Sequence, residues 1–310
     1  MKPTYVQHCD WGTVPNKRWR ARAKLQADGS YTTESIELAG DLTQLIPSIQ
    51  QEIGPTECAL MGFDFPIGIP APYADAAGIE HFKSFLTLLG LGQWTDFFSC
   101  ATRASEISLH RPFYPFIPGG TKQSQLLGAL GLPNIDDLRR KCEKKHSGRR
   151  AACPLFWTLG ANQVGKAAIV GWRDVLVPAI KAGKNVLLWP FDGPLDDLLQ
   201  PGNVVVCETY PAEYYRSIFS GPLKSKRRRE LRRGIAPALL KWASRKNITF
   251  ETAVRQEIET GFSHGDDDAF DAVIGLLGML EVVTGNRRTC DPTEEKIIKL
   301  EGWIFGQYIG

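Results

Sequence analysis

The chain has 310 residues, 43% of them hydrophobic and 23% charged, with a formal net charge of +3, which is the composition of an ordinary globular protein of one large or two modest domains. A net charge this small does not by itself indicate a nucleic-acid partner, so the distribution of the charged residues has to decide. Seven scattered cysteines without a Cys-x-x-Cys pair argue against a zinc ribbon or a disulfide framework, and without a signal core or an apolar span we expect a cytoplasmic protein with no membrane partner.

The first 70 residues predict three strands, a helix and a fourth strand. The second and third strands are joined by the turn Asp28-Gly-Ser and read as a hairpin, because apolar and polar residues alternate along both. The fourth strand is short and apolar and stops at Asp64. The expected strands are 4–9, 18–25, 31–38 and 58–63, and the helix is 41–53.

Residues 71–202 show a less regular and mainly helical pattern. Helices are expected at 79–90, 123–130, 135–144 and 165–182, a loop at 111–121, and one further strand-like stretch at 185–190. A strongly apolar strand at 204–207 follows, then a basic segment able to form a helix, and then a helix at 266–283.

This order predicts an α/β fold with a mixed five-stranded sheet flanked by helices. The core consists of 1–70 and 203–310, and the large, mainly helical insertion 71–202 lies between the fourth and fifth strands.

The helix at 266–283 is apolar nearly all round, which predicts a buried helix, yet its first turns carry several acids. Asp266 and Asp267 are explained by capping and by the positive end of the helix dipole. Asp268 and Asp271 are three residues apart and share one face, and a buried acid is normally kept where it is paired or bound to metal. We interpret Asp268 and Asp271 as a metal-binding pair.

Three of the expected strands end on a carboxylate: Asp10, Asp64 and Glu208. Ligands of open α/β sheets gather beyond the carboxyl ends of the strands, where the start of the acidic helix could join these residues. Each acid alone is also explained by a turn or a loop. The prediction of a shared carboxylate cluster therefore depends on all three acids standing at strand ends. Oxygen ligands without His or Cys indicate Mg²⁺ or Mn²⁺ and no organic cofactor.

This arrangement resembles the ribonuclease H-like superfamily, whose catalytic carboxylates lie on the first strand, the fourth strand and the last helix. The pair Asp268-x-x-Asp271 looks like the C-terminal acidic motif of Holliday-junction resolvases. A family of predicted ribonuclease H-like nucleases is similar in Asp64-Phe-Pro-Ile-Gly-Ile-Pro, Glu208-Thr-Tyr-Pro-Ala-Glu, Asp267-Asp-Asp-Ala-Phe-Asp-Ala and Glu301-Gly-Trp-Ile. The chain departs from that family's small-residue opening at Trp11 in Asp10-Trp-Gly-Thr.

The resemblance implies hydrolysis of DNA or RNA phosphodiester bonds with two divalent ions about 4 Å apart. Asp10 would bridge both ions, Asp64 would help to hold one, and Asp268 or Asp271 the other. Glu208 would be an outer ligand or orient the attacking water. His264 lies near the acids in sequence, but a loop histidine before a helix is more often structural.

The segment that begins Lys224-Ser-Lys-Arg-Arg-Arg and ends before Gly234 holds seven cations and one acid. Such a local positive field suits a phosphate backbone, although a solvated helix face, or a run that pairs with the acidic cluster, explains it almost as well. The expected phosphate contacts are Lys224, Arg227, Arg228, Arg229 and Arg233.

Two other functions stay open. One is a non-catalytic module on the same fold that binds nucleic acid or a protein partner. The other is an actin-like ATPase or a sugar kinase, because Asp10-Trp-Gly-Thr resembles a phosphate turn, although no second such turn is found. A phosphate loop at Gly160–Lys166 is disfavoured, because Ala167 stands where a P-loop needs Ser or Thr.

Overall fold

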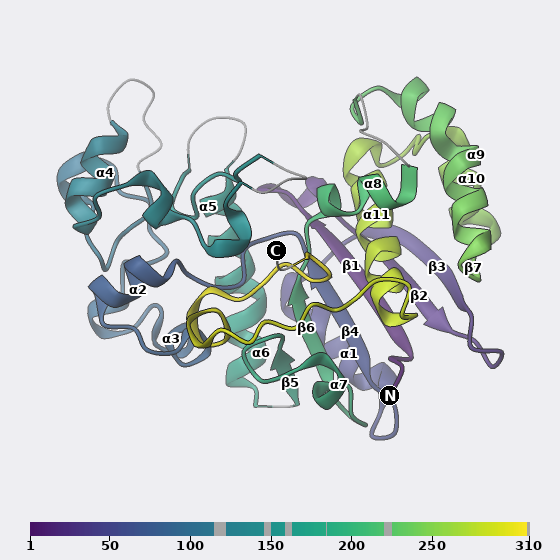
Figure 1. Cartoon of the computed structure of the whole chain (residues 1–310), viewed down its shortest axis with the longest axis horizontal. Coiled ribbons are helices and arrows are strands. Elements are labelled where there is room, and N and C mark those ends of the chain that lie inside the picture. The colour runs from purple at the N-terminus through teal and green to yellow at the C-terminus, as the bar shows by residue number, and fades with distance from the viewer. Residues whose placement is uncertain (115–121, 146–149, 159–162, 184, 220–224, 309–310) are drawn as a thin grey trace.

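A computed structural model of the chain describes residues 1–114, 122–145, 150–158, 163–183, 185–219 and 225–308. Its centre is a mixed sheet with the strand order β5-β6-β4-β1-β2-β3-β7 (Figure 1). Strands β1, β4, β6 and β5 run parallel, and β2 is antiparallel to both β1 and β3. The strands are β1 (Tyr5–Trp11), β2 (Arg18–Leu25), β3 (Tyr31–Leu38), β4 (Ala59–Phe63), β5 (Val186–Leu188), β6 (Val204–Glu208) and β7 (Ile248–Phe250).

The α/β class with helices on both faces of a mixed sheet agrees with the sequence, but the expected number of five strands is wrong. The sheet has seven, because β5 pairs with β6 at one edge and β7 pairs with β3 at the other. Both added strands have three residues, too short to show a period of two in sequence. The sequence predicts a strand-like stretch at 185–190 as part of the insertion. In the structure this stretch contains β5, which is an edge strand of the sheet.

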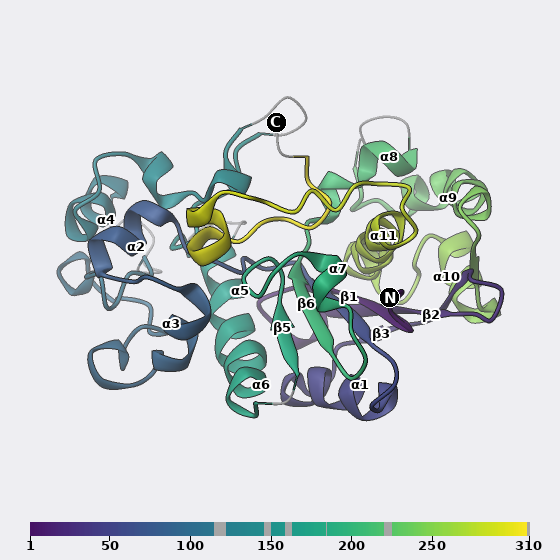
Figure 2. The same ribbon diagram turned by 60° about the horizontal axis from the view of Figure 1, so that its bottom comes forward.

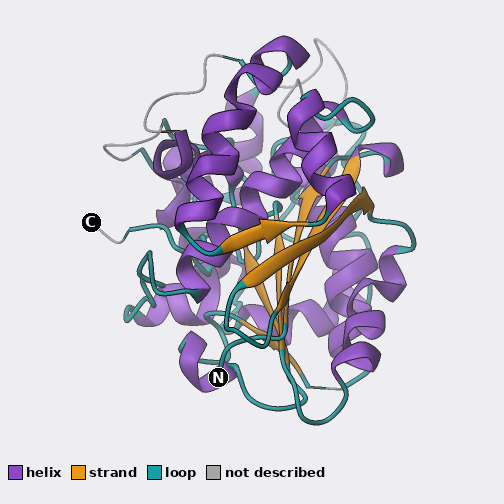
Figure 3. Ribbon diagram, turned by 90° about the vertical axis from the view of Figure 1, so that its right-hand side faces the viewer, coloured by secondary structure: helices purple, strands orange, loops and turns teal. Residues whose placement is uncertain are grey.

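Helices cover both faces of the sheet, and the strands twist between these two layers (Figures 2 and 3). Figure 2 shows α11 above the strands and α1 and α6 below them. The helices of the described residues are α1 (Leu45–Ile53), α2 (Ala71–Ala77), α3 (Phe82–Leu88), α4 (Gln123–Leu130), α5 (Val164–Gly171), α6 (Val177–Lys181), α7 (Leu195–Leu198), α8 (Tyr215–Phe219), α9 (Arg229–Arg245), α10 (Thr252–Thr260) and α11 (Asp266–Val283).

Each face of the sheet has its own hydrophobic core. One core joins alternate residues of β1 and β4 to α1 and to most of the elements between 71 and 180. The other joins the intervening residues to α9, α10 and α11. Since side chains of a strand alternate between faces, this division tells which face each strand-end acid points to.

The stretch 71–202 contains α2 to α7 together with β5, so it is mainly helical and also supplies one edge of the sheet. Helices α4 and α11 have the predicted bounds. The predicted helix at 165–182 is present as α5 and α6 with a π-helical turn between them. Proline at 178 lacks an N–H, and this removes one regular hydrogen bond from the continuous helix.

The predicted helix at 135–144 is wrong. The chain forms two separate 3₁₀ turns there, at Ile135–Leu138 and at Lys141–Glu143. The carboxylate of Glu143 accepts the Arg140 N–H at 2.9 Å, and Arg140 itself is extended, so local side-chain hydrogen bonds replace a helical ladder. No helix among the described residues combines the length and the apolar character needed to cross a bilayer.

Candidate functional site

Asp10 lies near the carboxyl end of β1 and belongs to the face of the sheet that α11 covers. Along β1, Val6 packs in the core of α11 and the His8 ring contacts that helix, with Nδ1 3.0 Å from the carbonyl oxygen of Ala272. Cys9 and Trp11 belong to the opposite core. Asp10 therefore continues the face of Val6 and His8 and points toward α11, where only 7% of its surface is exposed.

Asp64 follows β4 and lies beside Asp10. The Asp64 N–H donates to the Cys9 carbonyl oxygen at 3.0 Å, which continues the pairing of the parallel strands β1 and β4. Neither the Asp10 nor the Asp64 carboxylate has a hydrogen-bond or ion-pair partner among the described residues. A buried acid and a half-buried acid thus lie side by side without a neutralising contact, which is costly unless a cation joins them.

The electrostatics of this pair follow from burial and from mutual repulsion. Burial raises the pKa of Asp10 well above its ordinary range, the charge of Asp64 raises it further, and the charge of Lys226 lowers it. Burial also raises the pKa of Asp64, to about 7, against the lowering effect of Lys226. A bound cation would favour the ionised form of both acids.

Asp268, on the first turn of α11, forms an ion pair with Lys17. The Lys17 Nζ lies 2.8 Å from Asp268 Oδ2, and this contact raises the pKa of Lys17. Lys17 ends the 3₁₀ turn Pro15–Lys17 between β1 and β2. The negative charge of Asp268 raises the pKa of Asp10, so this acid belongs to the same electrostatic group.

Asp271, one turn further along α11, is buried and already bound by two side chains. Its carboxylate accepts a hydrogen bond from the Tyr215 hydroxyl and pairs with the Lys226 ammonium. Lys226 thus links Asp271 to Asp10 and Asp64, because its charge also lowers the pKa of those two acids. Each Asp271 carboxylate oxygen already has a partner, one in Tyr215 and the other in Lys226.

Glu208 differs from the other strand-end acids because it points to the opposite face of the sheet. In β6, Val205 and Cys207 pack with α11, whereas Val204 and Val206 pack on the other side, and Glu208 continues that second set. Both of its carboxylate oxygens bind Arg140, at 2.6 Å and 2.7 Å, and one also accepts the Ile67 N–H. Glu208 raises the pKa of Asp64 but is neutralised by its own partner.

Arg140 ties residues 71–202 to the rest of the chain. It is completely buried, pairs with Glu143 as well as Glu208, and donates to the backbone carbonyl of Glu301 at 3.0 Å. The Glu301 carboxylate in turn accepts the N–H groups of Ala71 and Lys141. A buried arginine with this many acceptors fixes several separate segments at once.

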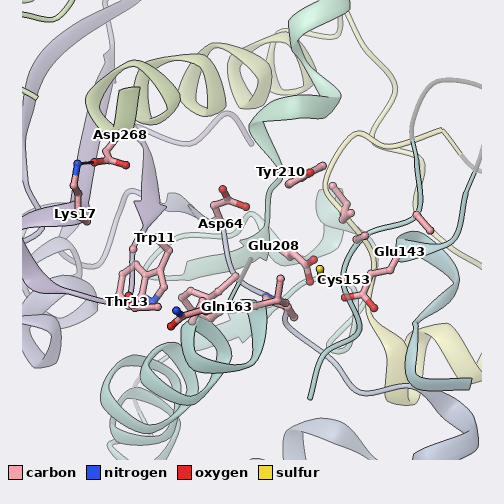
Figure 4. Close-up of a pocket in the computed structure, with 18 residues that line it drawn as sticks. Trp11, Thr13, Lys17, Asp64, Glu143, Cys153, Gln163, Glu208, Tyr210 and Asp268 are labelled. Carbon is pink, nitrogen blue, oxygen red and sulfur yellow. Dashed lines mark ion pairs between the residues drawn. The ribbon is translucent and has the colours of Figure 1, made fainter. Parts of the chain in front are cut away.

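A cavity of about 550 Å³ opens beside the acids, between the ends of β1, β4 and β6 and the start of α5. Figure 4 shows Asp268 with Lys17 on one side, Asp64 in the middle and Glu208 with Glu143 on the other. Trp11 and Gln163 form part of the wall nearest to α5. The Trp11 ring packs edge-on against Phe63 and Phe65 and lines the cavity.

The acids, histidines and cysteines of the described ranges form no ready-made metal site of three or more ligands. The reason is visible in the contacts: Asp268 faces Lys17 and Asp271 faces Lys226. The chemistry of the donors still suits a hard divalent cation, because Asp10 and Asp64 offer unpartnered carboxylate oxygens and Asp268 lies close by. Two acids of the site are therefore neutralised by lysines of the chain, Asp268 by Lys17 and Asp271 by Lys226.

The basic segment supplies surface cations and two internal contacts. Arg227, Arg228, Arg229 and Arg233 are exposed at the start of α9, as expected for phosphate contacts, and Lys224 lies outside the described residues. Arg229 also donates to the Thr260 carbonyl oxygen at 2.9 Å. Among the described cations of this segment, Arg232 is buried, and Lys226 is half-exposed and reaches the buried carboxylate of Asp271.

Sequence reasoning did not single out Lys17, Lys226, Arg232 or Arg140, although pairing of the basic segment with the acidic cluster was one of its alternatives. Lys226 and Arg232 lay inside a segment that reads as uniformly basic, and nothing in the spacing separates inward from outward cations. Arg140 was hidden in an apparent helix. His264 is exposed and pairs with Glu257 of α10, in line with a structural role.

Comparisons of the chain with protein-family models, with curated proteins and with solved structures find no match.

Proposed function

We propose that the protein is a nuclease that depends on a divalent cation and hydrolyses phosphodiester bonds of DNA or RNA. The observation that carries the proposal is the pair Asp10 and Asp64, a buried and a half-buried carboxylate side by side, with no hydrogen-bond or ion-pair partner among the described residues. Such a pair is stabilised by a cation, and a cation at the carboxyl edge of a sheet lies where substrates bind in α/β proteins.

The resemblance to the ribonuclease H-like superfamily supports the proposal. That superfamily places its acids on the first strand, the fourth strand and the last helix, and here Asp10 is on β1, Asp64 follows β4 and Asp268 opens α11. We therefore also propose a ribonuclease H-like fold. The exposed arginines at the start of α9 supply a positive surface for the phosphate backbone.

Each group of the site has a separate task. Asp10, Asp64 and Asp268 would hold Mg²⁺ or Mn²⁺. A bound divalent cation polarises the phosphoryl oxygen and lowers the pKa of water. Tyr215 and Lys226 hold Asp271, and the hydrophobic shell around Asp10 restricts water. Glu208, expected as an outer ligand, is assigned to binding Arg140.

The test is a cleavage screen of the full chain against single-stranded, duplex and branched DNA and against RNA, with Mg²⁺ or Mn²⁺. We expect cleavage with at least one substrate, and a loss of several orders of magnitude in Asp10→Asn and Asp64→Asn. Asp96→Asn, at an exposed position of the stretch 71–202, is the matched control and should leave activity unchanged.

Three outcomes would contradict the proposal. Full cleavage by a folded Asp10→Asn/Asp64→Asn double variant would separate the activity from these acids. Salt-sensitive binding of nucleic acid without cleavage under any condition would identify a non-catalytic module. ATP turnover without cleavage would identify the actin-like alternative.

A further inference from the structure

The charge of the acidic site is balanced in part by two lysines of the chain itself. Asp10, Asp64, Asp268 and Asp271 bring four negative charges when ionised, and Lys17 and Lys226 bring two positive ones. Four minus two leaves a charge of −2, which a single divalent cation neutralises. Asp267 adds a weaker and more distant negative charge to Asp10.

Lys226 is held in this place by the fold. The guanidinium of Arg232 is completely buried and donates to the Lys226 carbonyl oxygen at 2.7 Å and to the Gly261 carbonyl oxygen at 3.0 Å. The same guanidinium also contacts Asp266 at the start of α11. The backbone of Lys226 is therefore fixed relative to the acidic end of α11, although it lies in the loop before α9.

Lys17 is fixed from the other side. Gly12 lies so close to Lys17 that a β-carbon at residue 12 would come within 2.5 Å of the Lys17 carbonyl oxygen. Glycine at position 12 thus allows the turn after β1 to fold back tightly and to bring the Lys17 ammonium to Asp268. The local fold therefore positions both lysines, and each forms an ion pair with an acid of α11.

We propose that the site takes one divalent cation, held by Asp10 and Asp64 and joined by Asp268 once this acid parts from Lys17, and that the Lys226 ammonium takes the place of a second metal ion beside the scissile phosphate. This inference rests on the proposed nuclease function and changes the expectation of two ions. A second divalent ion would bring the added charge to +4 against −2, and it would have to displace Lys226 from Asp271.

The role of Lys226 in the reaction is electrostatic. In phosphodiester hydrolysis the water oxygen bonds to phosphorus, the bond from phosphorus to the leaving oxygen breaks with its electron pair, and a proton from water ends on the leaving oxygen. The Lys226 ammonium offsets the negative charge that builds up on the phosphoryl oxygens, and it gives up no proton in the overall reaction.

The experiment counts ions on the full chain without nucleic acid, by calorimetric titration with Mn²⁺ and by electron paramagnetic resonance of the bound Mn²⁺. The wild type should bind one ion per chain. Lys226→Met should bind a second ion, or bind the first about tenfold more tightly or better, because a nearby positive charge is removed. Lys226→Arg keeps the charge and should bind one ion. Lys181→Met, at the exposed end of α6, is the matched control.

Two bound ions in the wild type would overturn the inference, and so would a Lys226→Met variant with unchanged ion number and affinity. The wild-type count decides even where a variant fails to fold. Cleavage by a protein that holds two ions would leave the nuclease function standing and remove the role of Lys226. The wild type could instead bind one ion, with tighter or additional binding in Lys226→Met, and cleave no nucleic acid. That result would reject the nuclease function and leave Lys226 as a counter-charge to the acids.

Discussion

The carboxylates of Asp10, which is buried, and Asp64, which is half-buried, are held side by side without a partner among the described residues, and the free-energy cost of this arrangement depends on pH. An acid whose pKa is higher in the folded chain than in the unfolded chain stabilises the fold below the unfolded value. That stability is lost as the pH rises from the unfolded value through the folded value, because over this range the unfolded chain releases its proton while the folded chain keeps it. For Asp64 the two values are 3.8 and about 7.

We therefore predict that the cation-free protein loses stability as the pH rises from about 4 to about 7. In Asp64→Asn, which cannot ionise, this loss should be smaller, and the variant should exceed the wild type at pH 7 by on the order of a few kcal/mol. Urea unfolding in the presence of a chelator, repeated across this pH range, measures both effects.

Asp96→Asn serves as the control because Asp96 is exposed. Equal pH slopes for the wild type and Asp64→Asn would show that Asp64 is as well solvated in the folded chain as in the unfolded one.

The sequence identified Asp10, Asp64 and Asp268 because an acid at the end of a strand, or at the head of an apolar helix, is visible as a pattern. It could not assign Glu208 correctly without the register of β6. That strand is apolar on both faces, so its sequence does not show which face meets α11. The partner that neutralises Glu208 is more than sixty residues away and lies in a segment that reads as a helix.

At the scale of elements, α11 packs along the middle of one face of the sheet, and its close approach to β1 depends on glycine at position 275. A β-carbon at Gly275 would lie 2.2 Å from the His8 ring, in the middle of the sheet. Glycine normally weakens a helix interior, so its presence here marks a contact too close for any side chain. The same contact places the first turn of α11 beside Asp10.

We predict that Gly275→Ala destabilises the protein by about 1–3 kcal/mol, because crowding against His8 outweighs the better helix propensity of alanine. Gly128→Ala in α4 is the matched control, since a β-carbon there meets nothing within 4 Å. It should be neutral or stabilise by up to about 1 kcal/mol. Urea unfolding midpoints of the two variants give the comparison, and an unaffected Gly275→Ala would contradict the packing described for α11.

Helices and strands could be predicted from the sequence where their hydrophobic periodicity extends over many residues. They were missed where contacts of individual side chains determine the local backbone structure. The eighteen residues of α11 give a sustained apolar pattern, and its predicted bounds are confirmed. The stretch 135–144 has helical spacing, but Arg140 is drawn into a buried contact and divides the chain into two turns. Tertiary contacts of this kind override local propensity.

At the scale of the whole molecule, the start of α9 lies beside the head of α11 (Figure 1), where Arg232 of α9 contacts Asp266 of α11. If a nucleic acid crosses this region, Arg227 and Arg228 neutralise phosphates and release counter-ions on binding. Arg227→Ala/Arg228→Ala should then weaken binding uniformly across sequences. The slope of log affinity against log salt should fall in size by about two.

The matched control is Arg103→Ala/Lys181→Ala, which removes two exposed cations elsewhere on the molecule. Binding isotherms at several salt concentrations, measured with an uncleavable substrate or with Ca²⁺ in place of Mg²⁺, supply the slopes. Equal slopes for both double variants would place the nucleic-acid path away from α9.

The buried contacts of Arg140 make the stretch 71–202 inseparable from its surroundings. Arg140 and the N–H groups of Ala71 and Lys141 come from that stretch, whereas Glu208 and Glu301 come from the chain that follows it. Removing this stretch would take both N–H donors from the buried Glu301 carboxylate and leave Glu208 with the Ile67 N–H alone. The rest of the chain therefore depends on 71–202 for the partners of two buried acids, and cutting the stretch out would cost the free energy of two uncompensated charges.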